Sequence, residues 1–264
     1  PSTTASAYAT GVPASRISLD KALAQTRTGD IWLFRGRTAA DRTIQVTTNA
    51  PVNHVGMVVA LDDLPPLMWH AELGRSLPDL WSGTRHRGAQ LHDLRSSVLT
   101  WSKKYGQRAW FRQLDHPIDR EMEDAVLRTI ARIDGTPFPT PTQLASRWLL
   151  ARTPRLKQKM ADRELETAYC AEVVALTYEA MGLLPGGRTS WYDPGRFWSG
   201  DRLHMLRGAK LGREIAVDFT PTKAGSPAPP GSGDPGEGAR VRLAAIRRPW
   251  DAVSQRLPSA FQRG

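Results

Sequence analysis

The sequence predicts an α+β domain in which strands come first, helices follow, and one last strand closes the fold. Apolar runs typical of strands occupy residues 55–60, 67–73 and 108–114, and a turn–strand–turn pattern occupies 29–36. Helical spacing of apolar residues then appears at 118–133 and 170–181, before a closing strand at about 214–219. This order of elements is typical of an α+β architecture over residues 17–219.

Shorter elements complete the expected domain. Ser18 is placed to cap a short helix over 17–24, and acidic residues in the first turns of the helix at 118–133 suit its dipole. We expect a weak helix at 39–48, a loop at 62–66, an irregular segment at 74–104 and a basic helical region at about 142–161, in that order along the chain.

Composition divides the chain into four parts. Residues 1–16 are rich in Ser, Thr and Ala and are predicted to form a mobile arm, and 17–219 form the folded domain. Residues 220–239 are dominated by Pro, Gly and Ser, which indicates a linker. Residues 240–264 mix arginines with apolar and aromatic residues, which suits an interfacial segment, so this tail is expected to dock on an anionic membrane surface.

The formal net charge of +10 favours anionic partners such as cell-wall polymers or lipid headgroups. Nucleic acid is the disfavoured partner, because the arginines are scattered and no nucleic-acid-binding motif is present. No apolar run is long enough to span a bilayer, so we expect a soluble or peripheral protein, with its compartment left open. The single cysteine excludes an intrachain disulfide and a zinc site made of several thiolates.

Three polar residues occupy positions that suit nucleophilic catalysis. Cys170 is predicted to be the first residue of an amphipathic helix, where the helix dipole lowers the pKa of a thiol. His54 begins an apolar strand and is expected to act as the base, and His70 ends the next strand, from which it can orient the first imidazole.

The motifs around these residues resemble those of a known family. Gly-Asp-Ile-Trp-Leu-Phe at 29–34, Asn-His-Val-Gly-Met-Val-Val at 53–59, Met-Trp-His-Ala at 68–71 and Tyr-Cys-Ala-Glu-Val-Val at 169–174 resemble the circularly permuted NlpC-type papain-like hydrolases, which include lecithin–retinol acyltransferase-like enzymes. The resemblance implies a circularly permuted papain-like fold, with an antiparallel sheet packed against helices and the nucleophile Cys170 at a helix N-terminus. It also implies His54 as base and His70 as the third catalytic residue.

Several alternatives remain open beside this interpretation. Glu72 lies two residues from His70 on the same strand face and could orient His54 instead, and Tyr169 is a candidate neighbour of the oxyanion site. His86 and His92 are interpreted as solvated residues of a polar loop. A zinc site built from His54, His70 and Cys170 is a rival hypothesis, but no cofactor and no metal are predicted, because the usual local His/Cys spacing is missing.

The leading functional hypothesis is a thiol hydrolase that cleaves an amide bond of a peptide, an isopeptide or a cell-wall peptide through a Cys170 acyl-enzyme. A lipid acyl hydrolase or acyltransferase is the first alternative. The second is a catalytically inactive binding module whose basic tail does the work.

Overall fold

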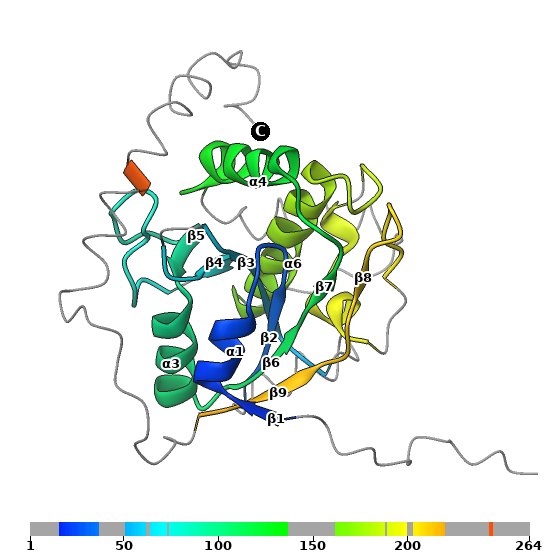
Figure 1. Cartoon of the computed structure of the whole chain (residues 1–264). Helices are drawn as coiled ribbons and strands as arrows, with labels where there is room; N and C mark the ends of the chain where they lie inside the picture. Colours follow the sequence, from blue (N-terminus) through cyan, green and yellow to red (C-terminus); the bar gives the residue numbers. More distant parts are fainter. Residues whose placement is uncertain are drawn as a thin grey trace, which may run out of the picture.

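The computed structural model describes residues 16–36, 51–61, 64–72, 74–136, 162–187, 189–199, 203–219 and 243–244 of the 264-residue chain. The architecture is α+β, with a mostly antiparallel sheet packed against helices on both of its faces (Figure 1). The predicted fold class is therefore confirmed at this level.

The main sheet has seven strands in the order β1-β9-β6-β2-β3-β4-β5. Only the β1–β9 pair is parallel among its described pairs, and β7 and β8 form a separate two-stranded sheet. The strands are β1 (Arg16–Ser18), β2 (Ile31–Arg35), β3 (His54–Val59), β4 (Leu67–Glu72), β5 (Gly88–Asp93), β6 (Arg108–Arg112), β7 (Leu114–Asp115), β8 (Lys210–Leu211) and β9 (Ile215–Asp218).

Side-chain alternation along the strands gives the sheet two different faces. On β3, Val55, Met57 and Val59 belong to one core cluster, whereas Val58 belongs to a second cluster. On β4, the residues Leu67, Trp69 and Ala71 likewise lie in the first cluster and Met68 in the second. We call the two sides the α6 face and the α3 face, after the helices that cover them.

The described α-helices are α1 (Leu19–Gln25), α3 (Leu94–Tyr105), α4 (Arg120–Ile133) and α6 (Asp162–Ala180), and two 3-10 turns follow at η1 (Thr189–Trp191) and η2 (Pro194–Phe197). Helix α6 packs against β3, β4 and α4. Helices α1 and α3 contribute apolar residues, such as Leu23 and Trp101, to the second cluster on the opposite face. Figure 1 shows α3 and α1 together on one side of the strands.

Side-chain caps explain where these helices begin. Ser18 accepts a hydrogen bond from the Lys21 amide at 3.3 Å, and Asp119 accepts one from the Met122 amide at 2.8 Å. Asp93 caps α3 in the same way, and Gly106 ends that helix at a φ of 60°, which a glycine adopts without strain. The predicted helices near 17–24 and 118–133 are thus confirmed with shifts of a few residues.

Two sequence-based expectations are wrong. The segment 74–104 is not irregular throughout, since it contains β5 and most of α3. Cys170 is not the first residue of its helix, because α6 begins eight residues earlier, at Asp162. The expected helices at 39–48 and about 142–161 lie outside the described residues.

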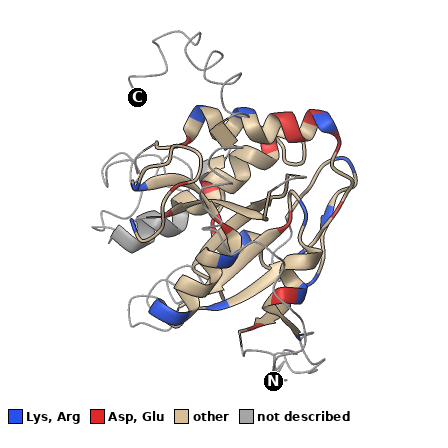
Figure 2. Ribbon diagram, turned by 60° about the vertical axis from the view of Figure 1, so that its left-hand side comes forward, with Lys and Arg blue, Asp and Glu red and all other residues tan. Residues whose placement is uncertain are grey.

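Most of the predicted arm, linker and tail also lies outside the described residues. Within the tail, Leu243 and Ala244 are described, and Leu243 is fully buried in the first core cluster. This residue therefore packs on the domain, while the membrane role of the tail stays a prediction. Figure 2 shows Lys, Arg, Asp and Glu scattered over the outer elements, whereas the central strands are largely tan. Of the helices in the described ranges, none combines the length and the apolar character that crossing a membrane requires.

Candidate functional site: a buried chain of histidines

Three histidines from three neighbouring strands form a hydrogen-bonded chain on the α3 face. His54 Nε2 lies 3.2 Å from His70 Nδ1, and His70 Nε2 lies 3.0 Å from His92 Nδ1. His92 Nε2 lies 3.1 Å from Gln90 Oε1, which ends the chain. Each histidine therefore uses one or both ring nitrogens to hold the next one.

The terminal amide sets the direction of the protons along this chain. Gln90 Nε2 donates to the backbone carbonyls of Glu72 at 3.3 Å and Gly88 at 3.4 Å, so its Oε1 is an acceptor that faces His92. His92 must then donate from Nε2, which leaves its Nδ1 as an acceptor if the ring is neutral. The same reasoning makes His70 donate from Nε2 to His92 and accept at Nδ1 from His54 Nε2. The chain thus leaves the lone pair of His54 on Nδ1.

Burial keeps the three rings neutral. Desolvation lowers the pKa of His54 from 6.5 to about 3 and that of His92 to about 4. The pKa of His70 is lowered well below 6.5, first by desolvation and then by the two neighbouring histidines. At pH 7 each ring therefore carries one proton, as the directional chain requires.

Aromatic side chains and a glycine hold the chain in place. The Trp101 ring of α3 packs edge-on against His54 and His70, with centroid separations of 5.1 Å and 4.9 Å. A Cβ built on Gly56 of β3 would lie 2.7 Å from Met68 Sδ and 3.2 Å from His70 Cβ. Glycine at this position therefore allows β4 and its histidine to approach β3 closely.

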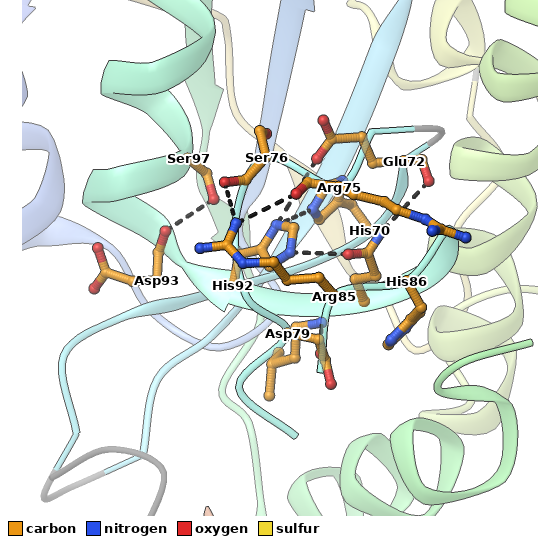
Figure 3. A network of polar contacts seen from close by, with 12 residues as sticks. His70, Glu72, Arg75, Ser76, Asp79, Arg85, His86, His92, Asp93 and Ser97 are labelled. Carbon is orange, nitrogen blue, oxygen red and sulfur yellow. Dashed lines mark hydrogen bonds and ion pairs between the residues drawn. The ribbon is translucent and has the colours of Figure 1, made fainter. Parts of the chain in front are cut away.

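Glu72 lies beside the far end of the chain, and a loop covers it (Figure 3). Its Oε2 is 3.9 Å from His92 Nδ1, and its carboxylate packs against Gly74, where a Cβ would lie 2.2 Å from Oε1. Arg85 donates to the Ser76 carbonyl at 2.6 Å. Asp79 raises the pKa of His92 electrostatically, while Arg85 opposes it, so the loop supplies charges of both signs.

Cys170 and the histidine rings contact different core clusters. Its side chain is fully buried in the first core cluster, whereas His54 contacts Phe34 and Trp101 of the second cluster. The expectation that His54 and His70 adjoin each other is confirmed by their 3.2 Å contact, and the pairing of Cys170 with His54 stays a prediction.

The contacts of α6 nevertheless place Cys170 near the His54 end of β3. Tyr178 donates to the Gly29 carbonyl. The Gly29 amide in turn donates to the Val58 carbonyl, which lies near the end of β3 that is opposite His54. Tyr169 donates at 3.5 Å to the carbonyl of Thr136, which also accepts from Ala89. Ala89 pairs with Ala71 on β4. Because β4 runs antiparallel to β3 and Trp69 lies opposite Met57, Ala71 lies toward the start of β3. Tyr169 thus helps to anchor α6, and its place beside an oxyanion site stays a prediction.

One group of buried residues in this site has the geometry of a metal site. The ligand atoms of His70, Glu72 and His92 lie within 4.8 Å of one another. The trio of His54, His70 and Cys170, which the sequence suggested as a rival zinc site, is not among the metal-capable groups of the described ranges. The second such group, Asp79, His86 and Asp134, is partly exposed.

The sequence reasoning missed His92 and Gln90, which it assigned to a polar loop. The signal was present in Gly88–Asp93, where Ala89 and Leu91 alternate with Gln90 and His92. Such alternation indicates a strand with one polar face. Because β5 pairs with β4 in the register His70–Gln90 and Met68–His92, this polar face extends the chain begun by His54.

The described surface also has a cavity of about 260 Å³, but none of the histidine chain lines it. Its lining residues are Thr26, Arg27, Thr28, Ala60, Leu114, His116, Pro117, Ile118 and Glu123. The candidate site is therefore defined by its buried polar chemistry and not by this cavity.

Comparison with known proteins assigns no family to the chain. No family model matches it, and no curated protein matches it. Among solved structures it is similar to the metalloprotein YiiX from Escherichia coli O157:H7 (DUF1105), with 20% identity and a TM-score of 0.38. The match covers 59% of this chain and 66% of the other chain, just under two thirds of its length.

These findings correct the resemblance inferred from the four motifs. The structural neighbour is described as a metalloprotein, and no family match supports a permuted NlpC-type papain-like or lecithin–retinol acyltransferase-like assignment. Two residues of these motifs have a structural role that does not depend on any family. Gly56 is required by close strand packing, and both oxygens of Asp30 bind backbone amides, those of Leu114 and Arg27, each at 2.8 Å.

Proposed function

We propose that this protein is a hydrolase that cleaves an amide bond through the Cys170 thiolate, with His54 as the general base. The observation that carries the proposal is the direction of the histidine chain, which leaves Nδ1 of His54 with a lone pair. A neutral imidazole oriented by a third polar group is the usual device for taking a proton from a nucleophile, and here His70 is that group. His70 is then a positioning residue for His54.

The location of the chain's only cysteine supports the same proposal. Cys170 lies near the middle of α6 and follows Tyr169, whose contacts lie toward the start of β3, where His54 is located. Its thiol is fully buried, so catalysis requires that the elements around it move when the substrate binds. Burial also makes His54 a weak base in the free protein, and the developing thiolate is the charge that raises its pKa during the reaction.

The proposed reaction is balanced as follows. The thiol proton passes to Nδ1 of His54, and the thiolate attacks the amide carbonyl to form a C–S bond. His54 returns the proton to the leaving amine as the C–N bond breaks, which leaves a thioester on Cys170. Water then attacks the thioester with the same imidazole as base, and the carboxylic acid and the free thiol are released.

The test uses two reagents. One is an electrophilic probe that resembles an amide substrate and reacts with thiols, and the other is a library of peptide amides. We expect the wild-type chain to label at Cys170 and to release amine, and Cys170→Ala and His54→Ala to lose both activities. His204→Ala is the matched control, because His204 is exposed and takes no part in the hydrogen bonds that join His54, His70 and His92. Amine release that persists in Cys170→Ala would contradict the proposal.

A further inference from the structure

The end of the chain opposite His54 carries a set of ligand atoms that neither gain nor lose a proton in the proposed hydrolysis. His70 Nε2, His92 Nδ1 and the Glu72 carboxylate lie within 4.8 Å of one another, and all three residues are at least 95% buried. We propose that these three groups bind a divalent transition-metal cation of the Zn²⁺ class, and that this cation switches off the base. The second half of the proposal rests on the proposed function of His54.

The distances between the ligand atoms fit a tetrahedral ion. Ligands at about 2.1 Å from a tetrahedral Zn²⁺ are about 3.4 Å apart. Here His70 Nε2 is 3.0 Å from His92 Nδ1, and His92 Nδ1 is 3.9 Å from Glu72 Oε2. Shifts of about half an ångström in these two separations would therefore meet the requirement. Two imidazoles and one carboxylate are a ligand set that Zn²⁺ accepts, and it leaves a fourth position for another ligand.

The surroundings of the ligands have the features of an outer shell around a metal. A ligating histidine is normally oriented by a hydrogen bond from its other ring nitrogen. His92 has such a bond from Nε2 to Gln90 Oε1 at 3.1 Å, which turns Nδ1 toward Glu72 and His70. His70 has a partner for its other nitrogen in His54, at 3.2 Å. Gln90 is itself held by two backbone carbonyls, so the orientation of His92 is fixed before any ion arrives.

Binding of the cation would reverse the direction of the chain. In the free protein His70 donates from Nε2 to His92, but a cation needs the Nε2 lone pair. Neutral His70 must then carry its proton on Nδ1 and donate it to Nε2 of His54. His54 in turn must carry its own proton on Nδ1. No proton is gained or lost in this exchange, yet the lone pair that serves as the base is removed.

The charges around the site allow a cation. The Glu72 carboxylate offsets one of its two charges, and Asp79 and Arg85 act on His92 with opposite signs. Arg85 is exposed, so its repulsion is weakened by solvent.

The first test measures metal binding without reference to activity. Zn²⁺ titration by calorimetry, and Co²⁺ substitution followed by visible absorption, should show one site per wild-type chain with a tetrahedral spectrum. His92→Ala and Glu72→Gln should weaken binding by about 100-fold, and Gln90→Ala by about 10-fold through the lost orientation of His92. His204→Ala is the control, because His204 is exposed and belongs to neither metal-capable group, and its affinity should match wild type. Because some variants could unfold, each is first checked by circular dichroism, and the wild-type Co²⁺ spectrum stands as a result independent of all of them.

The second test measures the coupling of the metal to the base. Saturating Zn²⁺ should slow alkylation of Cys170 at pH 7 by at least 10-fold in wild type and leave the rate in His92→Ala unchanged. Slowing in His92→Ala as well would mean that Zn²⁺ binds the thiol directly, which overturns the switch. Absence of a wild-type site, or a site that survives both ligand variants, overturns the metal centre. Failure of His54→Ala to change alkylation overturns the proposed function alone.

Discussion

The two faces of the central sheet are made from the same strands but differ in chemistry. Toward α6, β3 and β4 present Val55, Met57 and Trp69, and the indole N–H of Trp69 donates to Thr177 Oγ1 at 3.0 Å. Toward α3, the alternate positions carry His54 and His70. Because side chains alternate along a strand, a one-residue change of register would exchange these two faces. The comparison shows that both faces carry a buried apolar cluster, and that the α3 face also buries a directed chain of titratable rings.

The largest effect is expected from a change that opens the α6 face. Trp69→Ala removes a fully buried indole and leaves Thr177 without its donor, so the free energy of unfolding should fall by about 3–5 kcal/mol. Urea denaturation measures this loss. Trp191→Ala is the matched control, because Trp191 is 36% exposed and should cost about 1 kcal/mol or less. Similar losses for both variants would contradict the assignment of the main core to this face.

A second change tests whether the tail belongs to the same face. Leu243 is fully buried in the first core cluster, so Leu243→Ala should lower the free energy of unfolding by about 2–5 kcal/mol. Ala244→Ser, at the exposed neighbouring position, should change it by less than about 0.5 kcal/mol. If thermal unfolding showed an equal, near-zero effect of the two variants, Leu243 would not be packed on the domain. The whole tail would then be available for membrane docking.

The histidine face should make the protein sensitive to acid. The pKa values of His54 and His92 in the folded protein are about 3 and 4, below the ordinary 6.5. At a pH between these values and 6.5, the unfolded chain therefore binds more protons than the folded chain. Stability from the three neutral histidines is therefore complete above pH 6.5 and is lost as the pH falls. Asp30 acts in the opposite direction, because burial raises its pKa from 3.8 to about 6 and the folded state holds its proton longer.

These opposing groups give a net uptake of roughly two protons on unfolding near pH 5. The free energy of unfolding should therefore decrease by about 2–3 kcal/mol for each pH unit between pH 6 and 5. Urea denaturation at a series of pH values measures this slope, and His92→Gln should reduce it by about 1.4 kcal/mol per unit. A stability that is flat between pH 5 and 6.5 would show that the histidines are not neutral in the folded protein.

The smallest effect concerns the residue that directs the chain. Gln90→Ala removes the acceptor for His92 Nε2 and should cost about 1–3 kcal/mol of stability. It should also slow alkylation of Cys170, because His54 loses its fixed tautomer. Gln90→Glu keeps an acceptor for His92 Nε2 and should therefore restore the alkylation rate. A purely structural role of Gln90 predicts no such recovery. Equal rates in the two variants would remove the directional role.

Much of the fold could be predicted from local patterns, but the site could be predicted only in part. The apolar alternation around His54 and His70 located β3 and β4, and capping by Ser18 located α1. His92 was missed because the alternation of Gly88–Asp93 lies within a segment rich in Arg, Ser and Gly, and only the sheet register shows that His92 lies opposite Met68. The start of α6 was placed too late, since the residues before Cys170 lack an apolar periodicity. The different core clusters that His54 and Cys170 contact depend on tertiary packing that no spacing in the sequence expresses.

The central claim is that the histidine chain directs a lone pair of His54 for use as a base toward Cys170. The most direct measurement is the rate of iodoacetamide alkylation at pH 7, which has a single target because the chain has one cysteine. Rates in mild urea, below the unfolding transition, serve to expose the buried thiol to the same extent in each variant. The account predicts that His54→Ala reacts at least tenfold more slowly than wild type, while His204→Ala reacts at the wild-type rate. An unchanged rate in a folded His54→Ala protein would contradict the claim.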